Sequence, residues 1–131
     1  MPSAMQNDVH LEQAKQIAAN HVRYYIEVAN MPTTNEALRY LMNQKDMIVA
    51  PSKAVNAGGV AVSALEMSQN CERLVWSAEE VDEKLHTIMN TIYKNSVDAA
   101  ARNGLGYNLV AGANIAGFER VADAMMQQGV F

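Results

Sequence analysis

The feature that most constrains the fold of this chain is a change of hydrophobic period near residue 56. Before that point, two stretches with helical spacing alternate with two apolar strands, predicted at residues 22–28 and 47–50. This order is typical of a parallel sheet with helices packed on it. After residue 56 only helical spacing occurs, so the second half is expected to contain helices alone.

The first half carries signals for the ends of its helices. Asn7 or Asp8 is expected to cap the first helix, which ends near Asn20. Thr33 and Glu36 are spaced as a capping box that would open the second helix. In the strand at residues 22–28, alternate positions predict two faces: Val22, Tyr24, Ile26 and Val28 on one, and Arg23, Tyr25 and Glu27 on the other.

Three long helices are predicted in the second half. Ser77 and Glu80 form a capping box for the middle helix, which Gly104 and Gly106 would end, and Gly129 would follow the last helix. Each helix has an apolar stripe that is expected to pack: Val60, Ala64, Met67, Cys71 and Leu74 in the first, Val81, Leu85, Ile88, Ile92 and Ala99 in the second, and Ile115, Phe118, Ala122 and Met125 in the third.

Two strands cannot cover this much helix, and the chain starts just before a helix where a sheet would need another strand. The sequence is therefore interpreted as the C-terminal part of a larger protein. The fold class is a helix-rich α/β arrangement of about two parallel strands and about five helices. Residues 1–52 would end the sheet and residues 53–131 would form the C-terminal helices, as one partial domain.

Composition excludes several function classes. Ten Lys and Arg against 14 Asp and Glu give a net charge of −4 without a basic run, so neither nucleic acid nor an anionic membrane is an expected partner. The single cysteine, Cys71, forms no internal disulfide, and the histidines are not at metal-ligand spacing, so no metal is expected. With no apolar run of ~20 residues and no basic, apolar leader, a cytoplasmic location is expected.

Candidate binding residues follow both strands. Asn30 and Asn56 come after neighbouring strands, and the carboxyl ends of parallel strands share one edge where ligands bind. Asn56, Val60 and Ser63 lie four and three residues apart, on one helical face that offers an amide, an apolar wall and a hydroxyl. An anionic substrate is expected there. Equally, Asn30 is a common turn residue, and the small residues around Gly58 are also typical of close helix packing.

One glycine pair does not fit a phosphate-binding template. Gly104 and Gly106 follow a helix rather than a strand, and the third glycine of the dinucleotide fingerprint is missing. They are predicted to form a turn that ends a helix.

Several ordered motifs resemble hexameric glutamate dehydrogenases, of the glutamate/leucine/phenylalanine/valine dehydrogenase family. They are EVANMPTT at residues 27–34, APSKAVNAGGVAVS at residues 50–63, EMSQN at residues 66–70, Trp76, GANIAGF at residues 112–118 and VADAMM at residues 121–126. The resemblance covers essentially the whole chain. It implies the last part of a Rossmann-like dinucleotide-binding domain with its C-terminal helices. It also implies an oxidoreductase that reversibly deaminates L-glutamate to 2-oxoglutarate and ammonia with NAD or NADP.

The resemblance also assigns roles to the candidate residues. It makes Ser63 the group that hydrogen-bonds the side-chain carboxylate of the substrate, and Val60 a wall of the same pocket. Asn30 and Asn56 become neighbours of the nicotinamide end of the cofactor. This chain departs from the family at Val28, where glycine is usual, and a β-branched side chain restricts how closely the backbone can approach a ligand.

The same resemblance places the catalytic lysine and aspartate in an N-terminal domain to which nothing here corresponds. No catalytic residue is therefore assigned in this chain, Lys53 included, and the chain alone is expected to be inactive. The first half of the dinucleotide-binding domain is also absent, and the residues that would distinguish NAD from NADP lie upstream in that missing part. Because the strand at residues 22–28 has lost a neighbour, with only Arg23 and Glu27 as charges along it, self-association is expected. The alternative is a stand-alone helical interaction or assembly module without a ligand.

Overall fold

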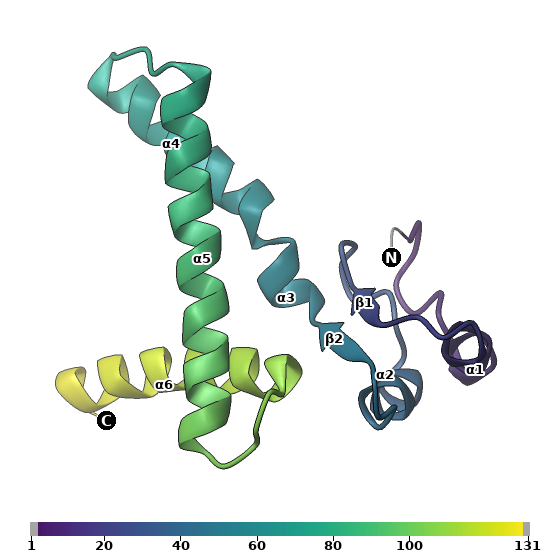
Figure 1. Ribbon diagram of the computed structural model, residues 1–131. Coiled ribbons are helices and arrows are strands. Elements are labelled where there is room, and N and C mark those ends of the chain that lie inside the picture. The colour runs from purple at the N-terminus through teal and green to yellow at the C-terminus, as the bar shows by residue number, and fades with distance from the viewer. Residues whose placement is uncertain (1–2, 130–131) are drawn as a thin grey trace.

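The structure of this chain is a computed structural model that describes residues 3–129 (Figure 1). It confirms the predicted order of helix and strand, with five helices of eight residues or more and one of four residues. The elements are α1 (Leu11–Ala19), β1 (Tyr24–Ile26), α2 (Asn35–Met42), β2 (Ile48–Ala50), α3 (Ser52–Val55), α4 (Ala57–Glu72), α5 (Ala78–Arg102) and α6 (Leu109–Gln128).

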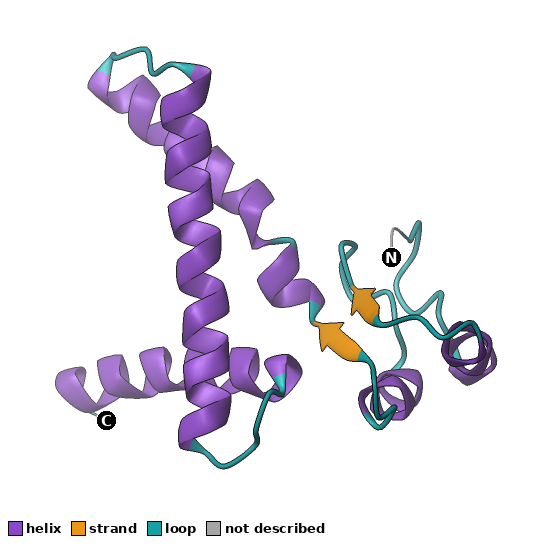
Figure 2. Cartoon of the chain, in the orientation of Figure 1, coloured by secondary structure: helices purple, strands orange, loops and turns teal. Residues whose placement is uncertain are grey.

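The two strands form a parallel pair, with Tyr25 opposite Val49 (Figure 2). The faces of β1 alternate as predicted, because Tyr25 is buried while Tyr24 and Ile26 are exposed. The strand is shorter than the predicted residues 22–28. Its inner face packs into the core cluster of Ala14, Tyr25, Ala37, Leu41 and Val49, which α1 and α2 complete.

The predicted cap of α1 was wrong. The helix begins after His10, whose backbone N–H donates to the Gln13 side chain over 3.1 Å. The Asp8 carboxylate instead accepts hydrogen bonds from the preceding residues Ser3, Ala4 and Met5, and these bonds, with Ser3 the largest cause, lower the pKa of Asp8. Because the Asp8 carboxylate accepts these hydrogen bonds within its own turn, it does not cap the first backbone N–H groups of α1.

The predicted cap of α2 was wrong by one residue. Thr34, not Thr33, accepts the hydrogen bond from the Ala37 backbone N–H. Thr33 is buried, and its hydroxyl lies 2.7 Å from the Tyr25 phenol oxygen. Val9 and Thr33 form a parallel β-bridge. This bridge holds Thr33 in extended pairing, so the next residue, Thr34, becomes the cap of α2.

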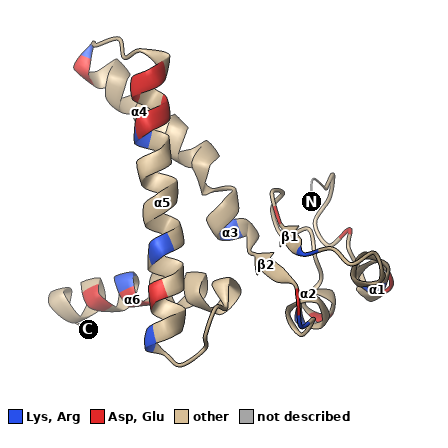
Figure 3. Ribbon diagram, viewed as in Figure 1, with Lys and Arg blue, Asp and Glu red and all other residues tan. Residues whose placement is uncertain are grey.

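The helical half extends away from the strands. In Figure 1, α4 and α5 meet at one end and diverge, while α6 crosses α5 near its C-terminal end. The capping box of Ser77 and Glu80 is confirmed, and acidic residues occupy that end of α5, where the helix dipole favours them (Figure 3). Gly104 and Gly106 form the predicted turn, with φ of 69° and 60°.

The predicted packing stripe on α4 was wrong, and the one on α6 was partly wrong. The stripe on α5 is buried or half-buried as expected, whereas all the stripe residues predicted between Val60 and Leu74 are exposed. On α6, Ile115 and Ala122 are half-buried but Phe118 and Met125 are exposed. Helix α4 instead faces α5 with Gly58. A Cβ added to Gly58 would lie 3.5 Å from the Leu85 side chain. Apolar residues surround both helices, so spacing alone did not identify the buried side.

Candidate functional site

The candidate site lies at the edge where β1 and β2 end. Because the strands are parallel, the loop after β1, residues 27–34, and the segment α3–α4 after β2 leave the sheet at the same edge. The backbone N–H of Glu27 donates to the Ala50 carbonyl over 3.1 Å, so the pairing continues just past the strands. Side chains from the two loops are thereby placed side by side.

The structure brings Asn30 and Asn56 together. The Asn56 Nδ2 donates a hydrogen bond of 2.5 Å to the Asn30 Oδ1. Asn56 precedes α4 but does not cap it with its side chain, so its amide is free to reach across to the other loop. Among the described residues, the Asn30 Nδ2 and the Asn56 Oδ1 have no partner, so this edge presents both amide N–H donors and a carbonyl acceptor.

Val60 and Ser63 lie on the side of α4 that follows on from Asn56, because the three residues are spaced four and three apart. Val60 is 75% exposed, and Ser63 is exposed with its hydroxyl donating to the Gly59 carbonyl over 3.2 Å. Of the two adjacent glycines, Gly58 faces α5, whereas a Cβ on Gly59 would meet nothing within 4 Å. Close packing therefore accounts for Gly58 and leaves the face of Val60 and Ser63 open.

A buried carboxylate joins the two loops, and sequence reasoning missed it. Glu27 is only 3% exposed, and its Oε2 accepts a 3.0 Å hydrogen bond from the backbone N–H of Ser52, the first residue of α3. Glu27 was counted from the sequence as one of two charges along an exposed strand edge, and its burial shows that part of the prediction to be wrong. The alternation of residues 22–28 did place Glu27 on the face of Tyr25, which was the available signal.

Hydrogen bonds from Val9 and Tyr25 also fix the loop that carries Asn30. Val9 donates from its backbone N–H to the Pro32 carbonyl and accepts from the Thr34 N–H, at 2.9 and 3.0 Å. The Tyr25 phenol bonds Thr33, and burial raises the pKa of Tyr25. The nearby charge of Glu27 raises that pKa further. Asn30 thus lies on a loop that is fixed by the buried Tyr25–Thr33 hydrogen bond and by the backbone of Val9.

Lys53 does not point to the candidate site. Its ammonium donates a hydrogen bond to the Asn114 Oδ1 on α6. This contact ties α3 to the C-terminal helix.

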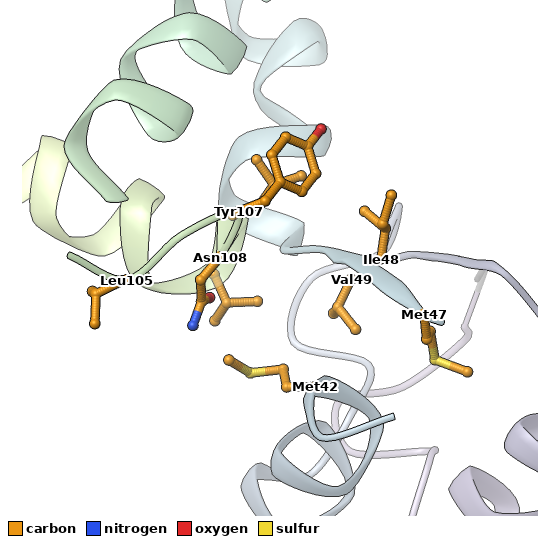
Figure 4. Close-up of a pocket in the computed structure, with 9 residues that line it drawn as sticks. Met42, Met47, Ile48, Val49, Leu105, Tyr107 and Asn108 are labelled. Carbon is orange, nitrogen blue, oxygen red and sulfur yellow. The ribbon is translucent and has the colours of Figure 1, made fainter. Parts of the chain in front are cut away.

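A second hollow lies beside β2, near where the loop before α6 packs (Figure 4). It measures about 250 Å³, and Met42 and Asn108 are among the side chains around it. The Asn108 Oδ1 already caps α6 through the Ala111 N–H, and the Tyr107 hydroxyl is bonded to that of Tyr93. The Asn108 carbonyl and the Tyr107 hydroxyl are thus engaged within the protein, most of the other lining side chains are apolar, and we assign the hollow no ligand.

The described residues contain no group of three or more His, Cys, Asp or Glu side chains placed to hold a metal ion. None of the helices described between residues 3 and 129 is long and apolar enough to cross a membrane. The candidate site consists of neutral side chains: the amides of Asn30 and Asn56, the apolar Val60 and the hydroxyl of Ser63.

Comparison with known proteins identifies close relatives. Residues 1–129 match the sequence profile of the Glutamate/Leucine/Phenylalanine/Valine dehydrogenase family. The chain is 72% identical to the NAD-specific glutamate dehydrogenase of Clostridium symbiosum and 52% identical to the NADP-specific glutamate dehydrogenase of Escherichia coli K12, each over 130 residues. A solved glutamate dehydrogenase structure, 72% identical, superposes with a TM-score of 0.94 over 99% of this chain and 29% of that chain.

The share of the relatives that is matched is small. The alignments cover 99% of this chain but only 29% of the length of each of the two curated relatives. The similarity is therefore complete for this chain and partial for the enzymes it matches.

Proposed function

This chain belongs to the glutamate/leucine/phenylalanine/valine dehydrogenase family, and we propose that it forms one wall of a glutamate dehydrogenase active site. The complete enzyme would oxidatively deaminate L-glutamate to 2-oxoglutarate and ammonia, reversibly, with NAD or NADP. In it, Ser63 and Val60 would contact the substrate, and Asn30 and Asn56 the cofactor. The remaining groups of the site would come from the part of the relatives that this chain does not cover.

The Asn30–Asn56 pair is the observation that carries this proposal. Two loops 26 residues apart in sequence place their amides in contact at the carboxyl edge of a parallel sheet. The remaining Asn30 Nδ2 donor and Asn56 Oδ1 acceptor match the acceptor and donor of a carboxamide, which is the group on the nicotinamide ring. The residues present thus fit the nicotinamide end of the cofactor.

Each residue would have a binding task. The Ser63 hydroxyl, which now donates to its own helix over 3.2 Å, can rotate to donate to a carboxylate oxygen. Val60 would exclude water beside the aliphatic part of the substrate. When bound, NAD or NADP supplies the chemistry by accepting hydride from the substrate. Proton transfers are left to groups outside this chain, because the four site residues are neutral.

A chimaeric enzyme tests the proposal. The matching 130-residue segment of the Clostridium symbiosum enzyme would be replaced by this chain, which is 72% identical to it. We expect glutamate-dependent reduction of the cofactor within about tenfold of that relative, because the geometry of the site is retained. The assay follows absorbance of the reduced nicotinamide.

The isolated chain is the matched control, and we expect it to show no turnover with either cofactor. Two results would contradict the proposal. One is a chimaera that folds and assembles like the relative but has no activity. The other is turnover by the purified chain alone. Inactivity of the folded chimaera would favour the stand-alone assembly module.

We also propose that the isolated chain self-associates. Large apolar side chains stand exposed on the outer sides of α4 and α6, and contiguous apolar surface is uncommon on monomers. Sedimentation equilibrium at micromolar concentration should give a mass above 14.3 kDa, and Phe118→Glu should lower it. A single 14.3 kDa species at all concentrations would refute this. The exposed residues are Val60, Met67, Phe118, Val121 and Met126.

A further inference from the structure

We propose that Glu27 is a positioning residue that sets Asn56 against Asn30, an inference that rests on the proposed function for the role of that pair. Its buried carboxylate lies at the end of β1 and accepts a hydrogen bond from the first N–H of α3. Through this bond, the loop that carries Asn30 and the segment that carries Asn56 are fixed to each other behind the site.

The segment between β2 and α4 needs such a support. Helix α3 has only four residues, Ser52–Val55, and so short a helix supplies few backbone hydrogen bonds of its own. It is followed directly by Asn56 and α4. Any tilt of α3 therefore moves the Asn56 amide relative to Asn30, whose loop is held independently by Val9.

Glu27 is suited to this task by its burial and its charge. A hydrogen bond to an ionised acceptor is about twice as strong as one between neutral groups, and burial reduces competition from water. The acceptor faces the start of α3, where the backbone N–H groups of the first turn lack partners within the helix. Lys53, bonded to Asn114 on α6, adds a second support on the solvent side of α3.

The test uses the whole 131-residue chain and a readout that does not depend on activity. We would measure by NMR the exchange with water of the Asn56 side-chain amide, which donates to Asn30. Glu27→Ala should raise this rate about tenfold, since it removes a hydrogen bond to a charged group. Glu27→Gln keeps a neutral oxygen acceptor for the Ser52 N–H and should give a rate between those of Glu27→Ala and the unmodified chain.

A second variant removes only the donor. Ser52→Pro deletes the N–H at the first position of α3, where proline is tolerated, and Pro51 already has the extended backbone (φ −76°, ψ 147°) that a following proline requires. It should raise the exchange rate as much as Glu27→Ala does. This variant keeps the inference testable if Glu27→Ala does not fold.

Ile17→Ala is the control for a general loss of stability. Ile17 lies in α1 and packs against the same core, outside both loops in the sequence, so this variant should lower the melting temperature and leave Asn56 exchange unchanged. Equal acceleration by Ile17→Ala, or no acceleration in folded Glu27→Ala or Ser52→Pro chains, would overturn the assignment of Glu27. An inactive chimaera would count against the proposed function and would leave this measurement unaffected.

Discussion

Ser63→Ala in the chimaeric enzyme is expected to lower kcat/KM for glutamate by about ten- to a hundredfold, while the Kd for the cofactor stays near its original value. A hydrogen bond to a charged group contributes roughly 1.5–3 kcal/mol, and the exposed Ser63 hydroxyl would donate such a bond to the side-chain carboxylate of the substrate. Steady-state kinetics with glutamate, and fluorescence titration with the cofactor, measure the two quantities separately.

Ser68→Ala provides a matched control on the same helix. The Ser68 hydroxyl donates to the Ala64 carbonyl over 2.9 Å, as Ser63 does to Gly59, but it lies on another side of α4. Removing it should leave all kinetic constants within about twofold, because only a surface hydroxyl is lost. The role of Ser63 would be rejected if Ser63→Ala left glutamate kcat/KM unchanged, or if Ser68→Ala lowered it equally.

The parts of the fold that could be predicted are those set by local chemistry. The capping box of Ser77 and Glu80 acts within four residues, so the start of α5 was predicted correctly. Both strands were predicted from alternation and apolar runs. The contact between Asn30 and Asn56 could also be predicted, because parallel strands place their carboxyl ends at one edge of the sheet whatever their detailed packing.

The parts that could not be predicted depend on distant partners. Thr33 fits a cap as well as Thr34 does by spacing, and only its bridge to Val9 and its bond to Tyr25 decide between them. A glutamate beside a strand edge is usually exposed, and the Ser52 N–H that keeps Glu27 buried lies 25 residues away. The faces of α4 and α6 that are covered are those in contact with α5, at Gly58 and Gly112, and neither helix specifies this contact by its own spacing.

The crossing of α5 and α6 gives the second large effect: Gly112→Ala is expected to destabilise the chain by about 3 kcal/mol. A Cβ on Gly112 would lie 1.9 Å from the backbone oxygen of Ser96 and 3.1 Å from the Ala100 Cβ. The first atom belongs to a helix backbone and cannot rotate aside, so the two helices must separate. Chemical denaturation followed by circular dichroism measures the loss.

Gly117→Ala separates this steric effect from the ordinary preference of helices for alanine. Gly117 lies in the same helix, and a Cβ there would meet nothing within 4 Å. This change should therefore stabilise the chain by up to about 1 kcal/mol, since alanine loses less backbone entropy than glycine in a helix. Because the same substitution is made in one helix, opposite signs at the two positions would isolate the contact with Ser96. Stabilisation by both substitutions would mean that α6 does not cross α5 at Gly112.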